Sequence, residues 1–330
     1  MFQHTLVAEI GSVHDGSFGN ALKLIELAAG CGADVVKFQT HLADAEMLPD
    51  APAPSYFQAE PRREYFTRTG FSLDQWRKLA KHCADNKVQF LSSPFSLEAV
   101  DLLEEVGVDA YKIASGEVSN TPLLERIAKT GKPVLLSSGM SDWDELGRAI
   151  EALRGASEIV PMQCTTAYPC PPERIGLNVI GEMHKRFGLP VGFSDHTRGP
   201  AAAIAAAALG AVCVEKHLTF STQMYGSDAP NAMEPPAFKE MAAGLRGVWT
   251  ALGHPVDKSD LTPYRDMKRV FEKSIVTARP VKAGQVIARA DLAFKKPGDG
   301  LPAWRYPEVV GHRCRRDLPL NHKVAAGDFE

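Results

Sequence analysis

The sequence predicts an α/β protein, a (β/α)8 (TIM) barrel followed by a small β-rich domain. Short apolar runs alternate with amphipathic, helix-length stretches from the first residues to about Leu252. Eight such repeats in about 250 residues match the size of this barrel. No G-x-G-x-x-G follows the first apolar run, which argues against the second candidate, an open doubly wound sheet.

Runs rich in Val, Ile and Leu predict the strands, and apolar residues that recur at helical spacing predict the helices. The predicted strands are residues 6–10, 35–39, 88–92, 110–113, 133–137, 159–164, 191–194 and 212–217. The predicted helices are residues 20–29, 73–86, 97–106, 122–129, 143–153, 179–187, 201–209 and 237–252. We expect Thr121 to cap one helix and Ser141, three residues before Asp144, to cap another.

Two regions depart from this rhythm. Residues 41–71 are polar and contain Pro49, Pro52, Pro54 and Pro61, which predicts a long loop after the second strand. After Leu252 the sequence predicts a charged linker over 253–274, with one helix over 264–272. Residues 275–330 are predicted as a β-rich domain with short strands near 274–278 and 281–285 and a turn at 297–300. The predicted domains are therefore 1–252 and 275–330.

Composition excludes several classes of protein. A formal net charge of −3 gives no reason to expect nucleic acid or an anionic membrane as a partner. No apolar run approaches the roughly 20 residues of a membrane span, and the first residues lack the pattern of a signal peptide. The cysteines are Cys31, Cys83, Cys164, Cys170, Cys213 and Cys314. Their scattered spacing favours reduced thiols, so we expect a cytoplasmic protein.

His196 and His217 each close a predicted strand, and one helix-length segment separates them. In a βαβ unit the carboxyl ends of both strands lie on the same rim, so the imidazoles are expected to converge there. They form a candidate binding site for a divalent metal, with Ser194, Asp195, Glu215 and Lys216 beside them. A pair of hydrogen-bonded barrel histidines is the alternative.

Two lysines, Lys37 and Lys112, interrupt apolar strands near their carboxyl ends. A lysine is seldom buried in a strand without an anionic partner. Together with the serines on the same rim, they are interpreted as a site for phosphate and carboxylate groups. A structural Lys–Glu ion pair and a Schiff-base lysine are the alternatives.

Several motifs together resemble the sialic acid synthase family, and they follow its order along the chain. They include Gly32-Ala-Asp-Val-Val-Lys-Phe-Gln-Thr40, Ser92-Ser-Pro-Phe95, Tyr111-Lys-Ile-Ala-Ser-Gly-Glu117, Leu136-Ser-Ser-Gly-Met140, Gln163-Cys-Thr-Thr-Ala-Tyr-Pro169, Gly192-Phe-Ser-Asp-His-Thr197, Glu215-Lys-His-Leu-Thr219 and Gly226-Ser-Asp228. The tail resembles the antifreeze-like (SAF, β-clip) domain that follows the barrel in these phosphoenolpyruvate-dependent nonulosonic acid synthases.

The resemblance implies a transferase that condenses phosphoenolpyruvate with the open-chain aldehyde of an N-acyl hexosamine, N-acetylmannosamine or a close relative. The products are a nine-carbon 2-keto acid and phosphate, formed by C–O cleavage. The implied ligands of phosphoenolpyruvate are Lys37, Ser93, Lys112, Ser115, Ser137 and Ser194. The implied sugar ligands are Gln39, Thr166, Tyr168, Asp228 and Lys296. The implied catalytic residues are Glu117, Glu9, His196 and Lys112, and the implied ligands of Mn²⁺ or Mg²⁺ are His196 and His217.

One position departs from the family in a way that bears on the sugar. Lys296 stands where these enzymes usually carry an arginine that reaches the active site of a partner subunit. The resemblance thus implies a homodimer with exchanged C-terminal domains. Because Lys296 replaces the arginine, we expect the N-acyl end of the substrate to differ from that of N-acetylmannosamine. Synthesis of legionaminic or pseudaminic acid from a diacetamido-trideoxyhexose is one alternative function. A Schiff-base keto-acid aldolase and a surface-binding protein are the others.

Overall fold

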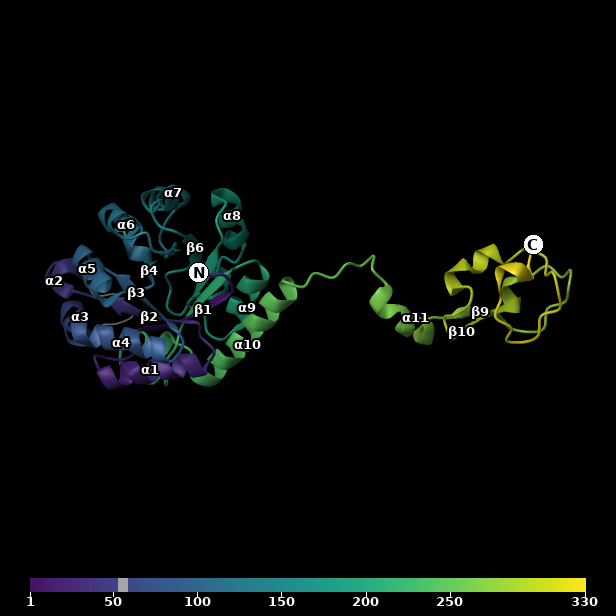
Figure 1. The fold of residues 1–330 in the computed structure, drawn as a ribbon, viewed down its shortest axis with the longest axis horizontal. Coiled ribbons are helices and arrows are strands. Elements are labelled where there is room, and N and C mark those ends of the chain that lie inside the picture. The colour runs from purple at the N-terminus through teal and green to yellow at the C-terminus, as the bar shows by residue number, and fades with distance from the viewer. Residues whose placement is uncertain (53–58) are drawn as a thin grey trace. The chain divides into compact units, whose positions relative to one another are not determined.

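The computed structural model describes residues 1–52 and 59–330, which divide into two compact units, Met1–His254 and Pro255–Glu330. In the first unit eight parallel strands pair in sequence order, and β8 also pairs with β1, which closes the barrel seen in Figure 1. The strands are β1 (Thr5–Gly11), β2 (Val35–Thr40), β3 (Gln89–Pro94), β4 (Ala110–Ile113), β5 (Val134–Ser137), β6 (Ile159–Cys164), β7 (Gly192–Asp195) and β8 (Cys213–His217). The predicted (β/α)8 fold is confirmed, and the open sheet is excluded.

Helices surround this barrel on its outer side (Figure 1). They are α1 (Phe18–Gly30), α4 (Leu73–Asp85), α5 (Leu97–Val106), α6 (Thr121–Ala128), α7 (Trp143–Ala152), α8 (Asn178–Phe187), α9 (Ala201–Ala208) and α10 (Pro235–Leu252). Both predicted caps were wrong by one residue. Asn120 caps α6 in place of Thr121, and Asp142 caps α7 in place of Ser141. In each case the observed cap is the residue whose side-chain oxygen reaches the free N–H groups of the first turn.

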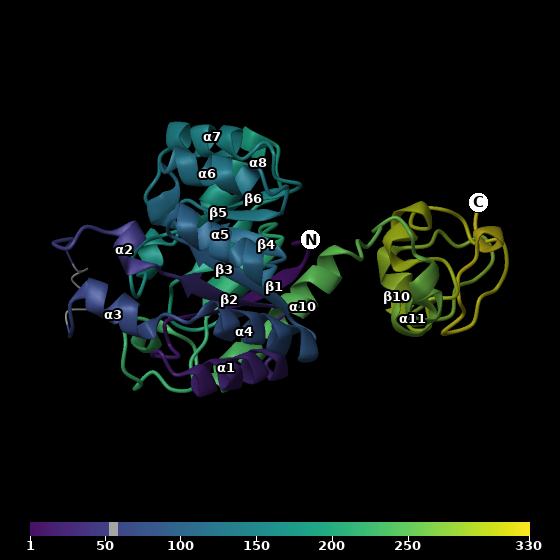
Figure 2. The ribbon, with the colours of Figure 1, turned by 60° about the vertical axis from the view of Figure 1, so that its left-hand side comes forward.

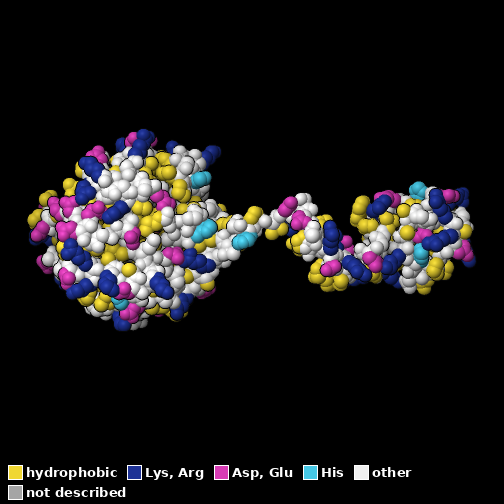
Figure 3. All heavy atoms as spheres, in the orientation of Figure 1, with side chains coloured by type: hydrophobic (Ala, Val, Ile, Leu, Met, Phe, Trp, Pro, Cys, Tyr) yellow, Lys and Arg dark blue, Asp and Glu magenta, His cyan; other side chains and the backbone are white. Residues whose placement is uncertain are grey.

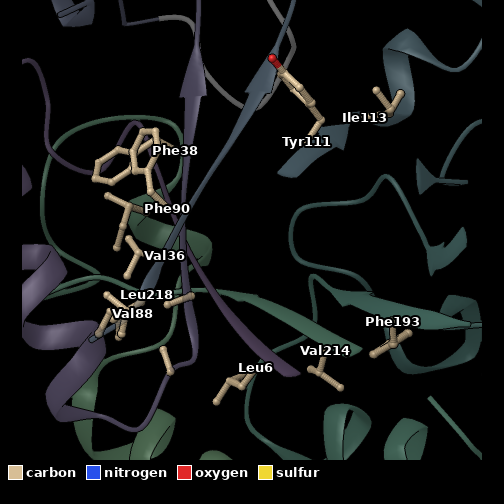
Figure 4. Close-up of a cluster of buried hydrophobic side chains, with 14 of the residues drawn as sticks. Leu6, Val36, Phe38, Val88, Phe90, Tyr111, Ile113, Phe193, Val214 and Leu218 are labelled. Carbon is tan, nitrogen blue, oxygen red and sulfur yellow. The ribbon is translucent and has the colours of Figure 1, made fainter. Parts of the chain in front are cut away.

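Side chains of each strand alternate between two hydrophobic layers. The outer layer packs against the helices and includes Val36, Phe38 and Phe90, which Figure 4 shows together. The inner layer fills the barrel itself and consists of Phe2, Val7, Val35, Leu91, Ala110, Leu135, Val160, Met162 and Cys213. Because the pleat has a period of two, a residue two positions after an inner one also faces the barrel axis.

The insert after β2 carries two short helices, α2 (Ala43–Glu46) and α3 (Arg62–Thr69), which lie near each other in Figures 1 and 2. The prediction of a loop over 41–71 was therefore wrong at these two segments. Pro61 directly precedes α3, a place where the missing N–H of proline costs no hydrogen bond. Tyr65 anchors α3, since its side chain is buried. Pro54 lies outside the described residues.

The second unit contains a two-stranded antiparallel sheet of β9 (Ser274–Thr277) and β10 (Leu292–Lys295). It is preceded by α11 (Arg265–Phe271), which falls within the predicted helix over 264–272. The strand expected near 281–285 is reduced to a single bridge between Val281 and Leu318. The second unit has a small hydrophobic core of its own, which consists of Ile275, Val281, Ile287, Leu292, Val309, Cys314, Leu318 and Val324.

Surface charge on the first unit is mixed. On the face of this unit drawn in Figure 3, basic and acidic side chains are interspersed with apolar ones. All six cysteines are buried and free. Within the described ranges, none of the helices has the length and apolar character needed to cross a bilayer.

Candidate active site

A ring of polar side chains faces the barrel axis at the carboxyl ends of the strands. Most members stand two positions after a residue of the inner apolar layer, as Glu9 follows Val7 and Lys37 follows Val35. Each strand contributes one member, and the ring consists of Glu9, Lys37, Ser93, Lys112, Ser137, Cys164, Ser194 and Glu215. All eight are at most 5% exposed. Because these residues stand at corresponding positions near the ends of their strands, their side chains form one polar layer.

Glu215 joins the two lysines of this ring. Its Oε1 lies 3.1 Å from Lys112 Nζ and 3.4 Å from Lys37 Nζ. Lys37 Nζ also lies 3.1 Å from Glu9 Oε2, while Ser194 donates a hydrogen bond to Glu215. The predicted alternative of a Lys–Glu ion pair is thereby confirmed as a feature of the barrel. Binding of phosphate and carboxylate groups by the same lysines stays a prediction.

Burial and charge act in opposite directions on these groups. Burial by itself lowers the pKa of Lys37, but Glu215 and Glu9 outweigh it and raise the pKa above the ordinary value. Burial favours the neutral form of Glu215, yet Lys112 and Lys37 hold its pKa well below the ordinary range. Lys37 and Glu215 are therefore both charged at neutral pH.

Hydroxyl groups surround the ion pairs. Lys37 Nζ donates to Ser93 Oγ at 3.4 Å, and Ser115, just after β4, accepts a hydrogen bond from the backbone N–H of Gly139 at 3.1 Å. Gly139 has to be a glycine, because a Cβ there would lie 2.4 Å from Oγ1 of Thr166. The loops after β4, β5 and β6 consequently meet closely beside the ring.

His196 and His217 lie on the same rim, with ring centroids 6.0 Å apart. Nδ1 of His196 lies 2.9 Å from the carbonyl oxygen of Thr165, so it carries the proton and leaves Nε2 with a lone pair. Nδ1 of His217 is buried and has no hydrogen-bond partner in the described part of the chain. Burial lowers the pKa of both rings, which favours neutral imidazoles, the form that binds metals.

These observations fit a shared divalent ion. Both rings are neutral, lie on one rim and each has a ring nitrogen free of any hydrogen-bond partner from the residues that the structure describes. The donor set is limited to the histidine pair, since among residues 1–52 and 59–330 no group of three His, Cys, Asp or Glu side chains could hold a metal. Asp195 and Lys216, also expected near this site, instead point to the outer side of the barrel and pair with each other.

Asp228 and Glu117 complete the rim. Oδ2 of Asp228 accepts hydrogen bonds from the backbone and the hydroxyl of Ser12, both at 2.8 Å. A Cβ at Gly11 would lie 2.3 Å from that oxygen, so this close approach requires glycine. Glu117 accepts a hydrogen bond from Asn120 at 2.7 Å, and burial raises the pKa of its carboxyl.

One cavity of about 510 Å³ brings nearly all predicted site residues together. Those that line it are Glu9, Lys37, Gln39, Ser93, Lys112, Ser115, Glu117, Ser137, Thr166, Tyr168, Ser194, His196, His217 and Asp228. Lys296 belongs to the second unit, where its ammonium group lies 4.8 Å from the centre of the Phe271 ring.

Several lining residues were not predicted as site residues. They are His41, Pro52, Arg62, Tyr65, Phe66, Phe95, Ala114, Gly116, Met140, Cys164 and Ser227. Glu215, which was expected beside the two histidines, lines the cavity as well. The spacing of two from an inner apolar residue could have identified Cys164, which follows Met162 in this way. Residues of the insert carry no such signal, because their position depends on how the insert folds back.

Comparison with known proteins identifies the family. The NeuB family profile matches residues 24–257, most of the chain. The chain belongs to the NeuB family. A SAF domain matches residues 272–327, as the resemblance of the tail implied.

Relatives of this NeuB protein are nonulosonic acid synthases, so it is an enzyme of the transferase class. An N,N'-diacetyllegionaminic acid synthase from Campylobacter jejuni is 36% identical over 93% of this chain and 94% of its own. The human N-acetylneuraminate-9-phosphate synthase is 33% identical, covering 93% and 88%. A pseudaminic acid synthase from Campylobacter jejuni is 30% identical, covering 98% and 96%.

Solved structures agree on the fold. The N-acetylneuraminic acid synthetase of Leptospira borgpetersenii, solved with citrate, has a TM-score of 0.71 at 25% identity and covers 80% of this chain and 89% of its own. A spore coat polysaccharide biosynthesis protein from Bacillus subtilis has a TM-score of 0.67 at 29% identity, covering 99% and 95%.

Proposed function

We propose that this NeuB enzyme condenses phosphoenolpyruvate with the open-chain aldehyde of an N-acyl amino sugar, giving a nine-carbon 2-keto acid and phosphate. The observation that carries the proposal is the cavity in which two buried lysines, a ring of serines and two neutral histidines meet. Lysines and hydroxyls suit the phosphate and carboxylate of phosphoenolpyruvate. The names of the relatives support the same reaction class.

A diacetamido-trideoxyhexose of the legionaminic type is the acceptor we favour over N-acetylmannosamine. The Campylobacter jejuni legionaminic acid synthase is 36% identical to this chain, against 33% for the human enzyme that makes the phosphorylated sialic acid. Lys296 supplies a point charge where the family usually has the planar fork of an arginine, so recognition of the acyl group is expected to differ.

The reaction needs no Schiff base, because phosphoenolpyruvate is already an enol derivative. Its C3 attacks the aldehyde carbon, and positive character develops at C2. Water adds to C2, and the C2–O bond to phosphate breaks, so that the water oxygen becomes the keto oxygen. One proton of the water ends on the former aldehyde oxygen, which becomes a hydroxyl, and the other ends on phosphate. Glu117, whose pKa burial raises, is the group that we assign to moving the water proton.

The charged ring acts on phosphoenolpyruvate in this proposal. Lys37 and Lys112 attract its phosphate and carboxylate, while Ser93, Ser137 and Ser194 donate hydrogen bonds from the same layer. His196 and His217 would hold a divalent ion, Mn²⁺ or Mg²⁺. Such an ion, when bound, supplies Lewis acidity toward the aldehyde.

A Schiff-base aldolase is the competing function, and the ion pairs argue against it. A lysine must lose its proton to attack a carbonyl, but Glu215 and Glu9 raise the pKa of Lys37, and Lys112 lies against Glu215. A surface-binding role for the second unit would not account for the ring of buried polar side chains in the barrel.

Phosphate release over a panel of N-acyl amino sugars tests the proposal. Release that requires both phosphoenolpyruvate and a sugar, fastest with the diacetamido-trideoxyhexose, is the expected result. Covalent trapping of the enzyme by pyruvate and borohydride, without phosphate release, would support the aldolase instead. Faster turnover of N-acetylmannosamine would refute the preferred acceptor while leaving the reaction class intact.

We also propose, from the resemblance alone, a homodimer in which Lys296 of one chain serves the cavity of the other. Mixing an inactive His217→Ala chain with an inactive Lys296→Glu chain is then expected to restore activity after subunit exchange, because one cavity in the mixed dimer has both residues. A mixture that stays inactive although exchange is verified would contradict this arrangement.

A further inference from the structure

His41, directly after β2, is held between two aromatic rings. Its imidazole stacks on Phe66 of α3 with 3.6 Å between centroids and 17° between planes, and on Phe95 after β3 with 4.1 Å and 13°. The side chain is 7% exposed, although the residue lines the active-site cavity. Two ring faces on opposite sides of an imidazole stabilise its cationic form through their quadrupoles.

Both ring nitrogens of His41 face oxygen atoms. Nδ1 lies 2.9 Å from both carboxylate oxygens of Glu46 on α2, whose side chain is 5% exposed, and Nε2 lies 3.1 Å from Oε1 of Gln39. The amide nitrogen of Gln39 in turn donates to Glu9 Oε1 at 2.7 Å. An ionised carboxylate and an amide oxygen only accept hydrogen bonds, so with Glu46 ionised each nitrogen of His41 donates one hydrogen bond.

The alternative orientation of the Gln39 amide is unfavourable. Turning the amide over would let its nitrogen donate to His41, but its oxygen would then face the carboxylate of Glu9. Glu9 also pairs with Lys37, which favours the ionised carboxylate. When His41 is an imidazolium, both of its N–H groups are therefore paired, one with Glu46 and the other with the amide oxygen of Gln39.

We propose that His41 is a positioning residue, a buried imidazolium that fixes the amide of Gln39 and, through it, the Glu9 carboxylate for binding the amino-sugar acceptor. The proposal rests on the proposed function, since it concerns the acceptor of that reaction. One hydrogen and one lone pair of the Gln39 amide remain for substrate hydroxyl or acyl groups. Because Glu46 and Phe66 belong to α2 and α3, the same contacts attach the insert to the rim of the barrel.

Three other titratable groups near His41 belong to the part of the chain that the structure describes. Arg62 at the start of α3 lies with its guanidinium 5.6 Å from the centre of the Phe66 ring, and Glu117 and His14 both interact electrostatically with His41. Glu46 is the one carboxylate in contact with the His41 ring among the described residues. Removing the charge of Glu46 is consequently the direct way to make the imidazolium less favourable.

The test compares His41→Phe, Glu46→Gln and a control, His254→Phe, which replaces an exposed histidine that contacts only the backbone of its own helix. His41→Phe keeps an aromatic ring in the stack but loses both N–H groups. We expect it to raise the KM for the acceptor about tenfold and to leave the KM for phosphoenolpyruvate within about twofold. Glu46→Gln is expected to raise the KM for the acceptor in the same way, whereas His254→Phe changes neither constant.

Nitrogen-15 NMR of histidine-labelled enzyme gives a second readout that needs no acceptor. The His41 ring of the wild type is expected to show two protonated nitrogens at pH 7, and the ring of Glu46→Gln is expected to show one. A neutral His41 ring in the wild type, or equal increases of both KM values in His41→Phe, would overturn the proposal. If the wild type releases no phosphate with any acceptor, the proposed function fails, and the NMR result still decides the charge of His41.

Discussion

Lys216 and Asp195 form a buried ion pair, with Nζ and Oδ2 2.8 Å apart, on the outer side of the barrel. Their side chains are 1% and 0% exposed. Each is the direct sequence neighbour of a ring member, Glu215 or Ser194, but the pleat turns it to the opposite face. Lys216 also donates to the carbonyl of Thr197, next to His196, so the pair holds the loop that carries one of the two histidines.

Replacing Lys216 by Met is expected to lower the free energy of unfolding by about 3–5 kcal/mol, because Asp195 is left as a buried charge without its cation. Denaturant unfolding measures this loss. The double variant Lys216→Met, Asp195→Asn is expected to recover part of it, since no uncompensated charge remains. A single variant as stable as the wild type would show that the pair contributes nothing.

Glu215→Gln is expected to destabilise the free enzyme and to increase the stabilisation given by phosphoenolpyruvate, because Lys37 and Lys112 lose their shared carboxylate and the ligand replaces it. Thermal unfolding with and without phosphoenolpyruvate measures both effects. A smaller ligand-induced rise in Tm than in the wild type would contradict the assignment of these lysines to the phosphoenolpyruvate site.

The same variant has a pH signature. The pKa of Glu215 is held below its ordinary value of 4.5 in the folded state, so its stabilisation is present above that value and is lost as the pH falls below it. Unfolding free energies measured between about pH 6 and pH 3 should therefore fall less steeply in Glu215→Gln than in the wild type. Parallel curves would mean that Glu215 titrates alike in both states.

Lys112→Ala is expected to raise the KM for phosphoenolpyruvate about ten- to a hundredfold or to stop turnover, since one charge-assisted hydrogen bond to the substrate is lost. Steady-state kinetics with each substrate varied in turn separates the two constants. If only the KM for the sugar rose, the assignment of Lys112 to the phosphoenolpyruvate site would be wrong.

Removal of metal by a chelator is expected to abolish phosphate release, and added Mn²⁺ to restore it. His217→Ala should lose calorimetrically measured Mn²⁺ binding as well as its rescue, because only His196 of the pair then remains. Full activity of metal-free His196→Ala enzyme would refute the metal site.

Asn120→Ser is expected to move the acid limb of the pH profile of kcat/KM to higher pH. Burial already raises the pKa of Glu117, and the variant removes the Asn120 amide that favours its carboxylate form. Serine can still cap α6, so folding should be preserved. An unchanged profile would exclude Glu117 as the group that controls this limb.

The barrel and most of its polar ring could be predicted because both depend on local pattern. Lys37 in an apolar run, or Ser137 at the end of another, already stands at the correct phase of the pleat. The capping residues were harder to locate, since Asn120 and Thr121 both have suitable side chains, and only the backbone conformation at the helix start selects between them.

The sequence by itself thus determined the eight-stranded barrel, the residues that face its axis and the family to which the motifs point, because a period of two is a property of each strand alone. Tertiary structure decided the rest. Glu215 joins Lys37 to Lys112 only when the barrel closes, and the insert with Phe66 reaches His41 only when it folds back on the rim. Such contacts bring together residues distant in sequence, and the free energy of burying them, which no local pattern records, selects their partners.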